Sequence, residues 1–302
     1  MKLNRFSCAS QYYSRVKDYL LQREAEHNLM LGICETLTRF PKRFTHTPYL
    51  AAVEEDDTIL AVAFRTPPHK LAISRSVHPQ ALQVLVEDLY SQSEHLPGVM
   101  GPEPEAKTFV EAWQAVTGQS YRMGRQERIY QLELVKPISL ASGQFRRATM
   151  DDRSLLIGWC QALLEAIGDE AKQDAERLVD GHLIDHALYL WQDNVTVSMA
   201  GCSRRTPNGI SINMVFTPPE YRKKGYATSC VASLSQTLLD SGHKYCFLFT
   251  DLNNPTSNQI YQDIGYQPVC DVNDYWFKPT TVTHSPNRAK QGGVSGGRGL
   301  SG

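Results

Sequence analysis

The hydrophobic pattern of the C-terminal part of the chain predicts strands on either side of one amphipathic helix. Residues 245–250 form a continuous apolar run, which is typical of a central strand covered on both faces. Apolar residues recur at three- and four-residue steps over 227–238, which predicts a helix with one buried stripe. Strands are also predicted over 187–191, 195–201 and 209–217. The order strand, helix, strand at 209–250 predicts a right-handed parallel crossover.

The pattern upstream and downstream completes a mixed α/β region. Further elements are predicted in this order: a strand over 128–135, a joint at 137–143, a strand over 145–149, helices over 151–164 and 170–185, a helix over 255–264 and a strand at 275–277. We expect an α/β (α+β) fold with a mixed, splayed central sheet flanked by helices. The predicted division is an accessory domain at 1–140, a catalytic domain at 143–278 and a disordered tail at 279–302.

Composition narrows the class of protein. The chain is 41% hydrophobic and 21% charged, which is ordinary for a soluble globular protein. Its length of 302 residues favours two domains. The formal net charge of −1 makes nucleic-acid binding an unfavoured function. No apolar run reaches the roughly 20 residues of a membrane span. Scattered cysteines without a CxxC pair fit reduced thiols, so we expect a cytoplasmic protein that does not bind membranes.

The run Tyr-Arg-Lys-Lys-Gly-Tyr-Ala-Thr at 221–228 is the strongest chemical signal. It lies between a predicted strand and a predicted helix, where backbone N–H groups and the helix dipole favour an anion. Its basic side chains favour a diphosphate as the occupant. The run matches neither a Walker loop nor the dinucleotide fingerprint.

A second motif follows at 254–266, where Asn254, Ser257, Ile260, Tyr261 and a terminal Gly-Tyr pair stand on a predicted helix. The two motifs, in this order, resemble the GNAT superfamily of acyl-CoA-dependent N-acyltransferases, and the resemblance covers about residues 143–278. It implies acetyl-CoA, or another acyl-CoA, as co-substrate. In this family the Arg-x-x-Gly-x-Ala run corresponds to the pyrophosphate loop.

The resemblance also implies which residues hold the co-substrate. The backbone of Val215, Phe216 and Thr217 would pair with the pantetheine arm, and Asn254 and Ser257 would line the opposite wall. The pyrophosphate would be held by the backbone N–H groups of Arg222, Lys223, Lys224, Gly225, Tyr226, Ala227 and Thr228. The basic side chains of this set would also meet the 3′-phosphate of CoA.

Candidate catalytic groups are few. The resemblance places a general acid at Tyr261, whose phenol is protonated at neutral pH and faces the leaving thiolate; the alternative is a core tyrosine. Candidate bases are Glu165, Asp169 and Glu170, or ordered water. We expect no metal site, because His182 and His186 lack a third ligand at a matching position, and we expect Cys230 to be a buried structural thiol.

The first half weakly resembles the second, which suggests a tandem pair of GNAT-like halves. Arg65-Thr66-Pro67 matches Arg205-Thr206-Pro207, and Gly118 matches Gly265. On this alignment the loop positions and the acid fall on Leu82, Leu85, Glu87 and Gln114, which suggests that the first half has lost the CoA loop and the acid. An unrelated α/β domain is the alternative. Such a first half would form a wall of the acceptor site, or a homodimer or partner surface.

The predicted function is an acetyl-CoA-dependent N-acetyltransferase that acylates an amine of a small molecule or peptide directly. Two alternatives stay open: a non-catalytic CoA-sensing or scaffolding protein, and an aminoacyl transferase that uses tRNA. The sequence has no motif that identifies the acceptor or the length of the acyl chain.

Overall fold

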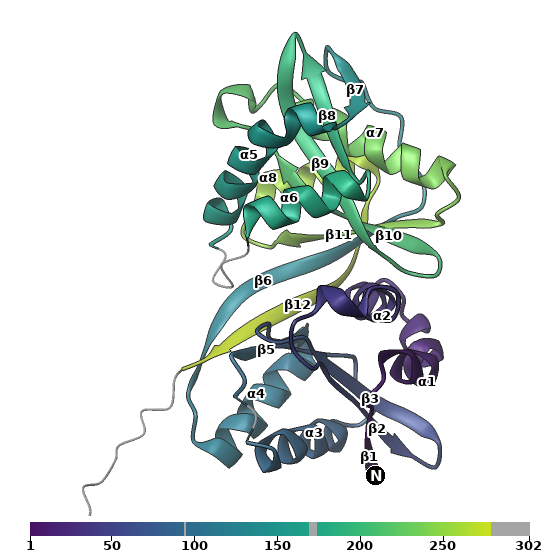
Figure 1. Cartoon of the computed structure of the whole chain (residues 1–302), viewed down its shortest axis with the longest axis vertical. Coiled ribbons are helices and arrows are strands. Elements are labelled where there is room, and N and C mark those ends of the chain that lie inside the picture. Colours follow the sequence, from purple (N-terminus) through teal and green to yellow (C-terminus); the bar gives the residue numbers. More distant parts are fainter. Residues whose placement is uncertain (94, 169–173, 279–302) are drawn as a thin grey trace, which may run out of the picture.

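The computed structural model describes residues 1–93, 95–168 and 174–278, and these form two lobes (Figure 1). One mixed sheet of 12 strands runs through both lobes in the order β1-β2-β3-β4-β5-β12-β6-β11-β10-β9-β8-β7. The mixed α/β fold expected from the sequence is therefore confirmed. The predicted tail at 279–302 and the candidate bases Asp169 and Glu170 lie outside the described residues.

The first half of the chain, residues 1–132, contains six strands and four α-helices within the described part. Its elements are β1 (Lys2–Arg5), α1 (Ala9–Leu21), α2 (Asn28–Arg39), the 3₁₀ turn η1 (Pro41–Arg43), β2 (Tyr49–Glu55), β3 (Thr58–Arg65), β4 (Leu71–Ile73), α3 (Pro79–Ser91), β5 (Gly98–Pro102), α4 (Glu103–Thr117) and β6 (Tyr121–Leu132).

The second half, residues 133–278, follows the elements that the hydrophobic pattern predicts. Its elements are β7 (Gln144–Arg147), η2 (Met150–Asp152), α5 (Arg153–Ala166), α6 (Ala175–Ile184), β8 (Leu188–Asp193), β9 (Val195–Arg205), β10 (Gly209–Phe216), η3 (Pro219–Tyr221), α7 (Tyr226–Asp240), β11 (Tyr245–Asp251), α8 (Pro255–Ile264) and β12 (Gln267–Phe277). The expected parallel pairing across α7 is confirmed, since β10 and β11 are parallel.

The succession strand, two helices, three strands, helix, strand, helix, strand occurs once in each half. In both halves the fourth and fifth strands are parallel, as β4 with β5 and β10 with β11. Gly118 ends α4 and Gly265 ends α8, so the two glycines that aligned in the sequence occupy equivalent helix ends.

The last strand of each half is exchanged. β12 pairs with β5 of the first half, and β6 pairs with β11 of the second half. β6 and β12 also pair with each other, and Figure 1 shows them running side by side between the lobes. The sheet therefore runs across the predicted boundary between a domain at 1–140 and a domain at 143–278. The division into these two domains stays a prediction.

In the described parts of the chain, buried apolar side chains form four clusters, one on each face of the sheet in each half. In the second half, α7 and α8 cover the sheet face that contains Tyr130 and Leu248, and α5 and α6 cover the other face. Cys230 is fully buried in α7, which confirms its structural position. Within the described residues, every helix is too short or too polar to cross a membrane.

Candidate active site

Strands β10 and β11 separate after a short parallel contact, which gives the splayed sheet that the sequence predicts. Their pairing runs from Gly209 to Ser211 on β10, whereas β10 continues to Phe216. The β9–β10 register shifts between Asn213 and Phe216, and Met214 adopts a left-handed φ of 49°. This bulge bends β10 away from its neighbour. The backbone of Val215 and Phe216 is therefore beyond the paired part of β11.

The predicted anion loop lies at the far end of β10. The side chains of residues 222–225 are exposed, and Arg222 closes the loop by donating from Nε to the carbonyl of Thr217 at 2.9 Å. Two residues of the loop are left-handed, Lys223 with φ 62° and Gly225 with φ 78°. Gly225 is the N-cap of α7, and glycine suits this conformation because it has no Cβ. The loop thus turns sharply into a helix N-terminus.

The start of α7 is fixed by side-chain contacts. Tyr226 is buried and donates from its hydroxyl to Asp193 at 2.7 Å. The Ser229 hydroxyl accepts a hydrogen bond from the Ala141 N–H at 2.8 Å. The first-turn N–H groups, which include those of Ala227 and Thr228, have no acceptor within an α-helix. A rigid helix end with free donors is suited to a phosphate group.

Asn254 and Ser257 take structural positions at the start of α8. The Asn254 side chain caps this helix by accepting from the Ser257 N–H at 3.1 Å. Pro255 occupies the first helical position, where its missing N–H costs nothing. The cap leaves the amide NH₂ of Asn254 as the group that a ligand could contact.

Tyr261 is buried, with 8% of its surface exposed, and packs between two other tyrosines. Its ring centroid lies 6.5 Å from that of Tyr130 and 5.9 Å from that of Tyr266. Within the described part of the chain its hydroxyl has no hydrogen-bond partner. Burial raises the pKa of Tyr261 to about 12. The phenol therefore keeps its proton at neutral pH, and its hydroxyl is available to hydrogen-bond a ligand.

The structure brings the strand, the loop and α8 together. Tyr261 belongs to the buried cluster of α7 and α8, and Val215, Tyr221 and Ile260 pack against the same cluster. Of the candidate bases, Glu165 is exposed near the end of α5. His182 contacts the Leu178 carbonyl at 2.8 Å and the Asn213 side chain at 3.2 Å. Glu165, the one described member of the predicted set, lies on α5, which covers the opposite face of the sheet from this cluster.

The equivalent turn of the first half is residues 74–78, between β4 and α3. Its N–H groups are already used: that of Arg75 donates to His27 at 3.2 Å, and that of Ser76 donates to Glu105 at 3.2 Å. The sequence alignment of Leu82, Leu85 and Glu87 with the loop is therefore wrong. These residues lie inside α3, because this turn is four residues shorter than residues 217–225.

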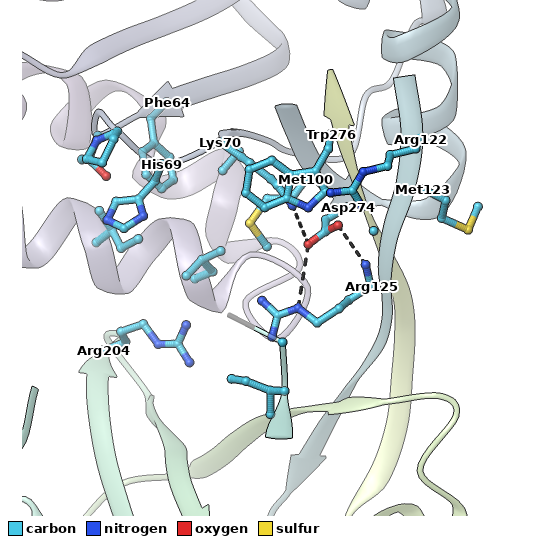
Figure 2. A pocket seen from close by; sticks show the side chains of 18 residues that line it. Phe64, His69, Lys70, Met100, Arg122, Met123, Arg125, Arg204, Asp274 and Trp276 are labelled. Atoms are coloured by element: carbon cyan, nitrogen blue, oxygen red, sulfur yellow. Dashed lines mark hydrogen bonds and ion pairs between the residues drawn. The ribbon is translucent and has the colours of Figure 1, made fainter. Parts of the chain in front are cut away.

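Sequence reasoning missed a cavity of about 700 Å³ between the halves (Figure 2). Its wall includes Lys70 and Arg122 from the first half and Arg204, Asp274 and Trp276 from the second. The site depends on the exchange of β6 and β12, which joins residues that are far apart in the chain. No local motif signals such a contact.

Comparisons with known proteins agree with this architecture. A family model described as FR47-like protein matches residues 190–277, which include the loop and α8. Among curated proteins, no match to this chain was found.

Three solved structures resemble most of the chain. An acetyltransferase of the GNAT family from Colwellia psychrerythraea aligns with a TM-score of 0.58 and 10% identity, over 92% of this chain and 100% of that one. A Drosophila protein aligns with a TM-score of 0.64 and 12% identity, over 92% and 98%. A GCN5-related N-acetyltransferase from Sphaerobacter thermophilus aligns with a TM-score of 0.55 and 15% identity, over 80% and 84%. These likenesses show that the chain has the GNAT fold.

Proposed function

We propose that this chain, whose fold is that of the GNAT superfamily, is an acyl-CoA-dependent N-acyltransferase with its catalytic site in residues 143–278. The observation that supports this most is the separation of β10 from β11 beside a loop that leads into α7. A strand with an unpaired edge and a helix N-terminus at its end suit an extended ligand with a diphosphate at one end.

Acyl-CoA fits this arrangement as the co-substrate. The pantetheine arm would pair with the backbone of Val215, Phe216 and Thr217. The N–H groups of residues 223–228 would hold the pyrophosphate, since the Arg222 N–H already donates to the Pro219 carbonyl at 3.3 Å. Lys223 and Lys224 have exposed side chains that would neutralise phosphate charge. Asn254 and Ser257 would line the other side of the arm.

The reaction would be a direct transfer. A neutral amine nitrogen attacks the thioester carbonyl carbon, the carbon–sulfur bond breaks, and an amide and the free thiol of CoA are formed. A strand N–H near the Met214 bulge would stabilise the oxyanion. One proton leaves the nitrogen and one reaches the sulfur, so the balance needs no other reactant.

Tyr261 would act on the leaving sulfur. A thiol has an ordinary pKa of about 8.5, so a phenol whose pKa is about 12 is the weaker acid. We therefore assign Tyr261 as the hydrogen-bond donor that stabilises the developing thiolate, while the proton on the released thiol comes from the attacking nitrogen. Glu165 is exposed on α5, on the opposite face of the sheet from Tyr261, so ordered water is the proposed base.

The first half would be a GNAT-like unit without an acyl-CoA site. This proposal is supported by its repeated order of elements and by the N–H groups of residues 75 and 76, which its own side chains satisfy.

A screen for CoA release tests the function. Purified protein is incubated with acetyl-CoA and with longer acyl-CoA thioesters against amines, amino acids, polyamines and peptides, and free thiol is measured. We expect amine-dependent release that is absent in Gly225→Glu. Tight CoA binding with no release for any amine would favour the sensing or scaffolding function, and release that persists in Gly225→Glu would refute the site.

A further inference from the structure

The cavity between the halves has a strongly cationic wall. Among the described residues that line it, Lys70, Arg122, Arg125 and Arg204 are cationic and Asp274 is the single carboxylate. Figure 2 shows Arg204 on one side of the cavity and the other charged side chains on the opposite side. This excess of positive charge favours an anionic ligand.

Asp274 is already paired with the first half. Its carboxylate lies 2.8 Å from Lys70 Nζ and accepts the Arg125 N–H at 2.9 Å. Lys70 also lies 3.6 Å from the centre of the Trp276 ring, and Arg122 lies 5.8 Å from the same centre. The Asp274 carboxylate is therefore paired with residues on its own side of the cavity, and it does not neutralise Arg204 on the opposite side.

Arg204 is the unusual residue of the cavity. Strand β9 pairs Ser203 with Ser211 and Arg205 with Ile210, so Arg204 is the extra residue of a β-bulge. Its φ of 53° is left-handed, which costs a non-glycine residue about 1 kcal/mol. Bulges of this kind turn a side chain out of the regular alternation. A strained backbone that redirects one charged side chain is a functional signal.

The Arg204 side chain is half-buried, and the structure only partly satisfies its guanidinium. Its Nε is buried and has no hydrogen-bond partner, and within the described chain its side chain makes no ion pair. Its contact is the Phe249 ring, whose centre lies 5.6 Å away. Burial lowers the pKa of Arg204, and the charge of Glu127 opposes this shift in part. A half-buried cation without an ion pair, with one N–H that has no acceptor, favours a ligand that supplies an anion.

The first half is adapted to this bulge. A Cβ on Gly32 of α2 would lie 2.6 Å from the Cβ of Arg204, so α2 approaches the bulge as closely as it does because residue 32 is glycine. Glycine inside a helix costs about 1 kcal/mol relative to alanine. The same helix lines the cavity through Leu29 and Ile33, next to Arg204.

The position of Arg204 relative to the splayed strand determines how long a ligand must be to reach both. Arg204 lies opposite Ile210 and Ser211, three residues before the Met214 bulge on β10. At the rise of a strand this separation is roughly 10 Å. The proposed acyl transfer takes place near Met214, so a ligand that reaches both points is extended.

We propose that the cavity binds the acceptor amine, and that Arg204 binds a carboxylate or phosphate group of that acceptor on the order of 10 Å from the nitrogen that is acylated. The proposal rests on the proposed acyl transfer. The apolar spacer between the two groups would lie against Trp276, Met100 and Phe64, which also line the cavity. Short α-amino acids cannot span this distance.

Calorimetric titration with matched ligands tests the anion site without turnover. The probes are ω-aminooctanoate, its counterpart without the carboxylate charge, ω-aminooctanamide, ω-aminoheptyl phosphate, and the short pair glycine and glycinamide. The proteins are wild type, Arg204→Gln, Arg204→Lys, the exposed neighbour control Arg205→Gln, and Gly225→Glu. Thermal unfolding of each variant accompanies the titrations.

We expect wild type to bind the long acid, the long phosphate or both at least about tenfold more tightly than the long amide, with no such preference in the short pair. The tighter of the two anions identifies the group. Arg204→Gln removes the preference and unfolds at the same or a higher temperature, Arg204→Lys keeps part of the preference, and Arg205→Gln keeps all of it. Equal binding of acid, phosphate and amide by wild type, or a preference that survives in Arg204→Gln, overturns the proposal.

Gly225→Glu separates this proposal from the proposed function. This substitution changes the loop at residues 221–228 and leaves the cavity unchanged. We therefore expect the variant to lose acyl transfer and to keep the preference for the long anion. A protein that never releases CoA but shows the Arg204-dependent preference supports the anion site and contradicts acyl transfer. Acyl transfer to the long acid and the long amide with equal kcat/KM contradicts the anion site alone.

Discussion

In the first half, residues 74–78 join the parallel strand β4 to α3, and in the second half residues 217–225 join β10 to α7. The shorter turn has its N–H groups bonded to His27 and Glu105, and Arg75 is held by Glu26 at 2.6 Å and Glu105 at 3.3 Å. The longer turn exposes basic side chains and leads into a helix end with free N–H groups. The same position in two similar folds is filled by an internal carboxylate in one half and open to an external anion in the other.

The two turns occupy equivalent places in the fold and differ in whether their backbone N–H groups are already bonded. Both turns start from a parallel pair of strands, so the fold alone does not predict which one binds. The decisive difference is whether protein side chains satisfy the backbone donors. By this criterion the second half would own the acyl-CoA site, and the first half would supply the cavity wall.

The largest effect is expected for substitutions at the helix start. Gly225→Glu places a carboxylate at the N-terminus of α7, and we expect CoA affinity to fall by at least about 100-fold, because charge repulsion adds to the loss of phosphate contacts. Equilibrium dialysis with CoA measures this.

Two controls sharpen this test. Gly225→Ala adds only a methyl group, 3.7 Å from the Ala141 Cβ, at a left-handed φ, so we expect a stability loss of about 1 kcal/mol and an affinity within about fivefold of wild type. His78→Glu changes the N-cap of α3, the equivalent residue of the first half, and leaves CoA affinity unchanged. Equal losses in His78→Glu and Gly225→Glu would remove the distinction between the halves.

Removal of the Tyr261 hydroxyl has the next largest effect. Tyr261→Phe keeps the buried ring, and its hydroxyl makes no hydrogen bond within the described residues, so stability changes little. We expect kcat to fall by about 100-fold while CoA affinity stays within about twofold. Stopped-flow thiol detection and equilibrium dialysis separate the two effects. A variant with full kcat would return Tyr261 to the alternative of a core residue.

Replacing the internal carboxylate tests the first half. Glu105→Gln keeps the shape but removes the charge that faces Arg75 and the Ser76 N–H. We expect unfolding in urea to cost about 2 kcal/mol less than in wild type, because a hydrogen-bonded charge pair is broken, with CoA affinity unchanged. If the variant gains a second CoA site or keeps full stability, the carboxylate is not the internal substitute for a phosphate.

The smallest effect is a pH dependence at the same turn. Burial lowers the pKa of His27 to about 4, and its neutral ring accepts the Arg75 N–H. The unfolded chain takes up a proton near its ordinary pKa of about 6.5 and the folded chain does not, so stability falls as pH drops through that range.

Between roughly pH 7.5 and 6, we expect His27 to contribute a loss of about 1 kcal/mol. Urea unfolding of wild type and His27→Gln at the two pH values measures it, and the loss should be smaller in the variant by that amount. Identical pH dependence in both proteins would show that His27 does not titrate differently on folding.

Local sequence patterns predicted most helices and strands of the second half, but they could not predict contacts between segments that are distant in the sequence. The run at 221–228 and the motif at 254–266 each lie within one turn or helix, so their spacing in the sequence is their spacing in space. The strand at the end of the chain was predicted only at 275–277, although β12 starts at Gln267. Its partners on β5 lie more than a hundred residues away, and no local pattern encodes them.

The same limit applies to the candidate sites. Arg204 and Arg205 are neighbours in the sequence, and alternation along β9 cannot tell which one faces inward, since the bulge shifts the register by one residue. The faulty alignment of the first-half loop has a similar cause, because a constant offset does not detect a turn shortened by four residues.

The number of CoA molecules bound per chain tests the central claim most directly. Calorimetric titration of the full chain with CoA should give one site per chain, and the site should disappear in Gly225→Glu but persist in His78→Glu. Two sites per chain, or a single site that is lost in His78→Glu and retained in Gly225→Glu, would contradict the account.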